Sequence, residues 1–114
     1  MKTIDKFIKE AHDNAVKHGF YKEKREIGTL LMLVVSELSE ALEADRKGLH
    51  VNLFDELNNE EIKNSFECEI ADVFIRLFDI CGFLNIDIQR FIEWKMQYNA
   101  KRDYKHGKKY WYDK

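Results

Sequence analysis

The sequence contains no proline and only five glycines, so few of its residues would interrupt a helix. It has two cysteines, Cys68 and Cys81, and we place both on one helix. At about 1.5 Å per residue they would lie roughly 20 Å apart, which is too far for a disulfide between them. Unpaired cysteines fit a reducing compartment, and we expect a cytoplasmic protein.

Long apolar runs and a strong excess of one charge are also missing. No segment approaches the roughly 20 apolar residues that cross a bilayer. The first ten residues (MKTIDKFIKE) alternate charges with single apolar residues, unlike a signal peptide. The formal net charge of −2 provides no general attraction to nucleic acid or to an anionic membrane. We therefore expect neither of these as a partner.

Length and composition favour one compact helical domain. The 114 residues are 45% hydrophobic and 35% charged, which supports a modest core and does not resemble a disordered chain. The chain shows no strand-like alternation of useful length, no internal repeat and no low-complexity linker. We expect a single domain over residues 1–114 with an all-α fold.

Apolar spacing and capping residues predict four helices in a bundle-like arrangement. Thr3 and Asp87 can cap the first and the fourth helix, and Gly19 and Gly48 stand where the first and the second would end. The predicted helices cover residues 3–19, 26–47, 65–82 and 87–104, with a short helix near 55–63 in the connection. The last ten residues (KHGKKYWYDK) form a basic, aromatic tail.

Three glutamates follow directly on the most apolar run of the chain, LLMLVV at 30–35. Successive residues advance about 100° around a helix. Glu37 therefore falls inside the apolar arc, Glu40 lies about 60° to one side of it, and Glu43 lies about 120° away. We expect Glu37 and Glu40 to point inward or to the edge of the core, and Glu43 to be solvated. The arc itself consists of Leu30, Val34, Ala41 and Ala44.

The third predicted helix carries one narrow ionic stripe on an otherwise apolar surface. The stripe consists of Glu69, Asp72, Arg76 and Asp79. A helix that is apolar nearly all round is usually buried, and unpaired buried carboxylates cost several kcal/mol each, in round terms. These acids therefore need a cation. Arg76 can also be interpreted more simply, as a bridge between Asp72 and Glu69 within the helix.

Two helices thus each present an inward pair of acids at spacing i, i+3. If the helices are antiparallel, the four carboxylates of Glu37, Glu40, Glu69 and Asp72 surround one point. Donor sets made only of oxygen favour a hard ion, Mg²⁺ or Mn²⁺, over Zn²⁺. A single E-x-x-E motif is usually a solvated charge pair, and the hypothesis of a metal site depends on finding two such motifs on apolar faces.

The fourth predicted helix becomes cationic toward its end. Lys95, Asn99 and Arg102 follow the spacing i, i+4, i+7 and share one face. Donors of this kind beside an acidic metal site suit a polyphosphate. The alternative is an ordinary solvated basic turn, which is also favourable at the C-terminal end of a helix dipole.

The paired acids, Glu37-x-x-Glu40 and Glu69-x-x-Asp72, resemble the E-x-x-E…E-x-x-D signature of the MazG-like, all-α nucleoside triphosphate pyrophosphohydrolases. The resemblance covers most of the chain. The similar segments, in order, are HDNAVKHGFY, SELSEALEADRKG, EIADVFIRLFDICG and KMQYNAKRDYKHGKKY. One departure is Asp103, where related sequences often have proline.

The resemblance implies hydrolysis of a (deoxy)nucleoside triphosphate to the monophosphate and pyrophosphate, for nucleotide-pool control or house-cleaning. It also implies a homodimer or homotetramer in which helices of two or more chains build each pocket. The metal ligands and catalytic residues would be Glu37, Glu40, Glu69 and Asp72, one of them serving as base. The substrate-binding residues would be Asp79, Lys95, Asn99 and Arg102.

Three other interpretations compete with this one. A ferritin-like di-iron bundle needs E-x-x-H motifs, which the sequence lacks. The pair His12-Asp13 could suggest a His-Asp phosphohydrolase, but no second suitable histidine accompanies it, and both are interpreted as surface residues. The non-enzymatic alternative is a helical nucleotide-binding or interaction module without significant turnover.

Overall fold

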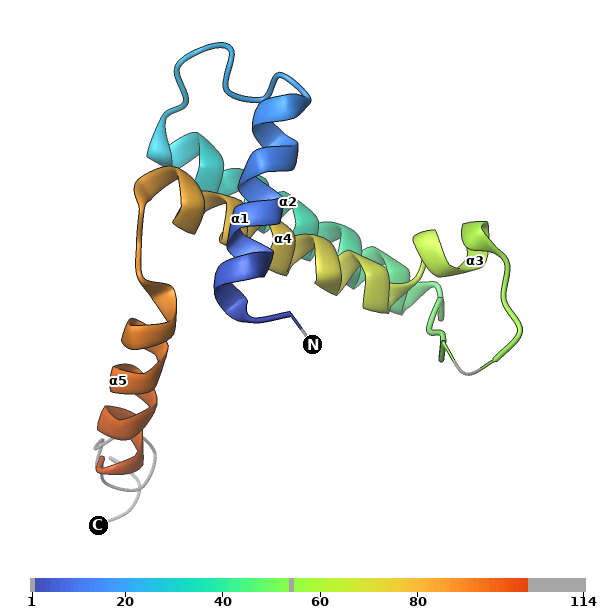
Figure 1. Cartoon of the computed structure of the whole chain (residues 1–114). Coiled ribbons are helices and arrows are strands. Elements are labelled where there is room, and N and C mark those ends of the chain that lie inside the picture. The colour runs from blue at the N-terminus through green and yellow to red at the C-terminus, as the bar shows by residue number, and fades with distance from the viewer. Residues whose placement is uncertain (1, 54, 103–114) are drawn as a thin grey trace.

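The computed structural model describes residues 2–53 and 55–102, and the regular elements within these ranges are helices (Figure 1). They are α1 (Ile4–Lys17), α2 (Ile27–Arg46), α3 (Asn59–Lys63), α4 (Phe66–Leu84) and α5 (Ile88–Ala100). The all-α prediction is confirmed, and each of the four predicted long helices corresponds to an observed one. The fourth ends at Ala100 rather than near residue 104. The basic, aromatic tail and Asp103 lie outside the described residues. None of the described helices is long and apolar enough to cross a membrane.

Side-chain caps explain where two of the long helices begin. The hydroxyl of Thr3 accepts a hydrogen bond from the Lys6 N–H, and the hydroxyl of Ser65 accepts one from the Cys68 N–H. Asp87 precedes α5 as predicted, but its side chain makes no capping hydrogen bond. Its carboxylate turns toward the side chain of the next turn instead, 3.9 Å from Arg90 Nε. The prediction that the side chain of Asp87 caps this helix is therefore wrong.

The third predicted helix ends later than expected. α4 continues through Gly82 to Leu84 and ends where Asn85 adopts a left-handed conformation, with φ of 56°. Gly82 is not a helix stop. A Cβ added to it would lie 2.7 Å from the Cβ of His12, so this glycine allows α1 to approach α4 closely.

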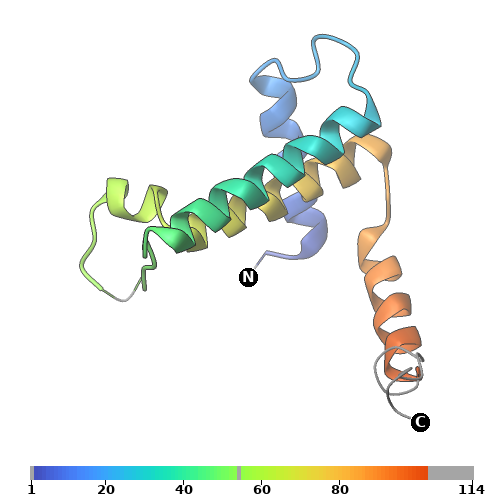
Figure 2. The same cartoon turned by 180° about the vertical axis from the view of Figure 1, so that it is seen from behind.

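α2 and α4 lie side by side and antiparallel, and α1 crosses α4 (Figures 1 and 2). Leu30 and Val34 are buried between the helices, and so are Ala41 and Ala44. These four residues form the apolar arc in which the sequence places Glu37, so the predicted helical phase of α2 is confirmed. The central apolar cluster consists of Leu30, Val34, Val73 and Ile80, with Phe20 and Leu84 packed against it.

α5 extends away from the other helices (Figures 1 and 2). Three of its large apolar residues, Phe91, Trp94 and Met96, are more than 60% exposed. The chain has an accessible surface of 9611 Å² and a radius of gyration of 17.8 Å. A compact monomer of this mass would have about 6,600 Å² and about 13 Å. Three long helices therefore pack together within one chain, and much apolar surface remains uncovered.

Candidate metal centre

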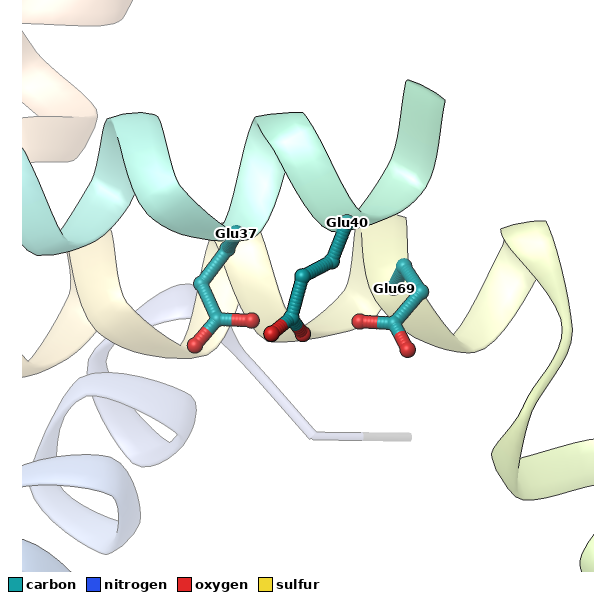
Figure 3. Close-up of side chains that lie close together, drawn as sticks. All are labelled: Glu37, Glu40 and Glu69. Atoms are coloured by element: carbon teal, nitrogen blue, oxygen red, sulfur yellow. The ribbon is translucent and has the colours of Figure 1, made fainter. Parts of the chain in front are cut away.

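Three of the four predicted metal ligands lie together. Glu37 and Glu40 extend from α2 and Glu69 from α4, and one carboxylate oxygen of each lies within 4.8 Å of the other two. Figure 3 shows the three side chains on the same side of the helix pair. We call these three residues the acidic cluster. The antiparallel pairing of α2 and α4 brings them together, as the sequence predicted.

The acidic cluster is short of positive charge. Oε2 of Glu69 is buried and has no hydrogen-bond partner among the described residues. Burial and then the charge of Glu40 raise the pKa of the Glu69 carboxyl. A buried polar atom without a partner is rare in proteins. Such an atom inside a group of like charges is a position where a cation would be strongly favoured.

Arg76 supplies the one guanidinium that contacts the acidic cluster within the described chain. Its Nε donates a 2.8 Å hydrogen bond to Oε1 of Glu37. The side chain thus links α4 to α2, which differs from the alternative of a bridge within α4. Glu37, with only 13% of its side chain exposed, is partnered, whereas Oε2 of Glu69 has no partner among the described residues.

Asp72 stands beside the acidic cluster rather than within it. Although the residue is exposed, partial burial of its carboxyl and the charge of Glu37 raise its pKa, while Arg76 lowers it. Asp72 and Glu37 both line a pocket of about 320 Å³ between α1, α2 and α4. The other lining residues are Ala11, Asn14, Ala15, His18, Ile75, Arg76 and Asp79.

A second pocket, of about 390 Å³, lies on the other side of the acidic cluster and is lined by Glu40 and Glu69. Glu43 is also at its edge, with 58% of its side chain exposed and its carboxylate 3.7 Å from the amine of Lys47. The prediction that Glu43 is solvated is therefore confirmed, and its different environment makes it a useful comparison for Glu40.

Asp79 has partners that the sequence did not reveal. Oδ1 lies 2.9 Å from Nδ1 of His12, and Oδ2 accepts a 2.7 Å hydrogen bond from the hydroxyl of Tyr21. The interpretation of His12 as a surface residue is wrong, because its side chain is only 25% exposed. His12 lies four residues after Ile8 and so on the inward face of α1, and this spacing could have predicted its partial burial. Tyr21 lies beyond the end of α1, where no helical periodicity applies.

Of the predicted phosphate-binding residues, Lys95 and Asn99 lie on α5 and Arg102 lies just beyond its end. α5 extends away from α2 and α4, which carry the acidic cluster (Figure 1). Lys95 and Arg102 both lie over the ring of Tyr98, with the charged groups 5.1 Å and 5.6 Å from its centre. Arg102 also contacts Oδ1 of Asn99 at 3.5 Å. Neither of the two pockets beside the acidic cluster is lined by these residues.

The donor set of the acidic cluster consists of oxygen alone. Carboxylate oxygens suit Mg²⁺ or Mn²⁺, and the unpartnered oxygen of Glu69 fits a ligand role. An ion held there would neutralise charge next to a pocket large enough for part of a small molecule. Comparisons of the chain with protein families, with curated proteins and with solved structures gave no match.

Proposed function

We propose that the protein hydrolyses a (deoxy)nucleoside triphosphate to the monophosphate and pyrophosphate in a metal-dependent reaction, in nucleotide-pool control or house-cleaning. The observation that carries this proposal is the acidic cluster with the unpartnered buried oxygen of Glu69, beside a pocket lined by Glu37, Asp72 and Arg76. The resemblance of the paired acids to the MazG-like enzymes supports the choice of reaction.

Glu37, Glu40 and Glu69 would hold the metal, and Asp72 would face it from the pocket. Mg²⁺ or Mn²⁺ bound there supplies charge neutralisation for the phosphates and lowers the pKa of a bound water. Arg76 holds Glu37 in place with its 2.8 Å hydrogen bond and leaves the second oxygen of Glu37 available. Asp72 lines the pocket and would orient a water or accept its proton.

We also propose a homodimer or homotetramer as the working form. The chain exposes about 3,000 Å² more than a compact monomer of its mass. An obligate homodimer buries about 1,000–2,500 Å² on each partner, so a second copy can account for most of this excess. Apolar side chains are exposed on α2, α4 and α5, and such a copy would cover them and complete a helical bundle.

A second copy would also explain why the predicted phosphate-binding residues lie away from the acidic cluster of their own chain. Lys95, Asn99 and Arg102 do not line the pockets beside the acidic cluster of their own chain. On a second copy, the same residues would approach the acidic site of the first chain and contact the phosphates. Each pocket would then be incomplete in a monomer.

The test is pyrophosphate release from a panel of normal and modified nucleoside triphosphates with Mg²⁺ or Mn²⁺. We expect release from at least one of them, loss of release in Glu69→Gln, and retention in the matched variant Glu43→Gln. Binding of a triphosphate without release would favour the alternative, a nucleotide-binding module without turnover. Orthophosphate as the sole product, or neither binding nor release, would contradict the proposed function.

A further inference from the structure

Asp79 is a buried carboxylate outside the acidic cluster, with 11% of its side chain exposed. Both of its oxygens have partners, Nδ1 of His12 at 2.9 Å and the hydroxyl of Tyr21 at 2.7 Å. The two partners come from different segments, α1 and the connection between α1 and α2. We call these three residues the Asp79 network. Removing one partner of a buried charged group leaves that group costly to bury, so the network resists distortion.

Two further contacts support the Asp79 network. The missing side chain of Gly82 leaves room for His12, since a Cβ there would lie 2.7 Å from the His12 Cβ. The ring of Tyr21 stacks on that of Phe83, with centres 4.6 Å apart. It also meets the His12 ring edge-on at 5.0 Å. The crossing point of α1 and α4 is therefore defined by both hydrogen bonding and steric fit.

The crossing point forms one end of the 320 Å³ pocket. α1 and the residue that follows it supply one wall of this pocket, which consists of Ala11, Asn14, Ala15 and His18. α2 and α4 supply the opposite wall, on which Asp79 itself lies. His12 follows the first residue of the α1 wall directly in the sequence. The acidic cluster, in contrast, is built by α2 and α4 without α1.

We propose that the Asp79 network is a positioning device that sets the distance between the two walls of the pocket, and thereby the affinity for the nucleotide, without taking part in metal binding. The inference rests on the proposed function. It gives Asp79 a different role from the predicted contact with substrate: its oxygens hold His12 and Tyr21, and it keeps α1 in place.

Two variants disturb the Asp79 network in different ways. Tyr21→Phe removes one hydrogen bond and keeps the ring, while Gly82→Ala pushes α1 away from α4 and changes no polar group. The matched control is Gly28→Ala in α2, where an added Cβ meets nothing within 4 Å. The use of two unrelated variants keeps the test valid if one of them fails to fold.

Three measurements are made on the full chain. The first is the dissociation constant of Mn²⁺ alone, by titration calorimetry. The second is the affinity for α,β-imido deoxynucleoside triphosphates with Mg²⁺, because these analogues resist cleavage of the scissile bond. The third is amide hydrogen exchange in α1 and α2. In Tyr21→Phe and Gly82→Ala we expect faster exchange in α1, unchanged Mn²⁺ binding and about tenfold weaker analogue binding. The control should match the wild type.

Failure of the inference can be distinguished from failure of the proposed function. If the wild type binds the analogues and both variants bind them equally well, the Asp79 network does not position the pocket. Unchanged exchange in α1, or a parallel loss of Mn²⁺ binding, would also overturn the inference. If the wild type binds no analogue, the proposed function fails and the inference fails with it.

Discussion

Arg76 of α4 and Glu37 of α2 form a 2.8 Å ion pair that joins the two helices beside the acidic cluster. The pair partly neutralises the acidic cluster before any metal binds. On the other side of the cluster, Oε2 of Glu69 has no hydrogen-bond partner among the described residues. Negative charge is therefore compensated at Glu37 but not at Glu69. Substitutions at Arg76 and at Glu69 should change the stability of the metal-free protein in opposite directions.

Arg76→Gln should destabilise the metal-free protein and increase its response to Mg²⁺. Without the guanidinium, the carboxylates repel one another with less compensation. Loss of about 1 kcal/mol would lower the melting temperature by roughly 4–8 °C, and the rise on adding Mg²⁺ should exceed that of the wild type. Thermal melts at constant ionic strength measure both effects. The control is Arg90→Gln, a largely exposed arginine on α5; equal behaviour of the two variants would refute the prediction.

Glu69→Gln should have the opposite effect on the metal-free protein. It removes the buried charge whose pKa is raised, so stability without metal should increase. For the wild type, Mg²⁺ at 100 times its dissociation constant should contribute about 2.7 kcal/mol, a rise of roughly 10–20 °C. The variant should lose most of this rise, whereas Glu43→Gln should keep it. An undiminished rise in Glu69→Gln would show that the acidic cluster is not the metal site.

His50 lies between Asp45 of α2 and Glu67 of α4, and it predicts a pH dependence of the free energy of unfolding. Its two ring nitrogens lie 2.8 Å from Asp45 and 2.9 Å from Glu67, and these contacts raise its pKa above 6.5. A group whose pKa is raised by folding stabilises the protein fully below its unfolded pKa and loses that contribution as pH rises through its folded pKa. The stability advantage of the wild type over His50→Gln should therefore shrink as the pH rises above about 6.5. Chemical denaturation at several pH values tests this, and a constant or growing advantage would contradict it.

The sequence predicted those parts of the fold that depend on local signals. The start of α1 follows from the cap Thr3, and the phase of α2 follows from the spacing of Leu30 and Val34, which placed Glu37 correctly. The Tyr21–Asp79 hydrogen bond could not be predicted, because the two residues are 58 positions apart. In addition, Tyr21 lies in the connection between α1 and α2, where no helical periodicity shows which way a side chain points. The predicted third helix ended at Gly82. The reason for a glycine at this position is the close approach of His12 on α1, which local sequence signals do not show.

The position of α5 could not be predicted for a related reason. Its amphipathic pattern shows which face needs a partner but not which surface provides one. In the described chain no other helix covers Phe91 or Trp94, which remain 63% and 61% exposed. The spacing of Lys95 and Arg102 predicted that they share one helix face. It could not predict that this face lies away from the acidic cluster of the same chain.

Trp94→Glu should separate oligomerisation from metal binding. A charge in the exposed apolar face of α5 would be costly to bury against a second copy, so the variant should become monomeric in light scattering coupled to size-exclusion chromatography. Mn²⁺ binding should persist, because the acidic cluster belongs to α2 and α4 of one chain. Binding of the α,β-imido analogues should fall at least tenfold, since the pocket would lose the cations of the partner.

Lys95→Ala should weaken analogue binding without changing the oligomer, and Gln89→Ala on the same helix should change neither. A wild-type protein that is monomeric at micromolar concentration, or a monomeric Trp94→Glu that binds the analogues normally, would show that each chain completes its own pocket.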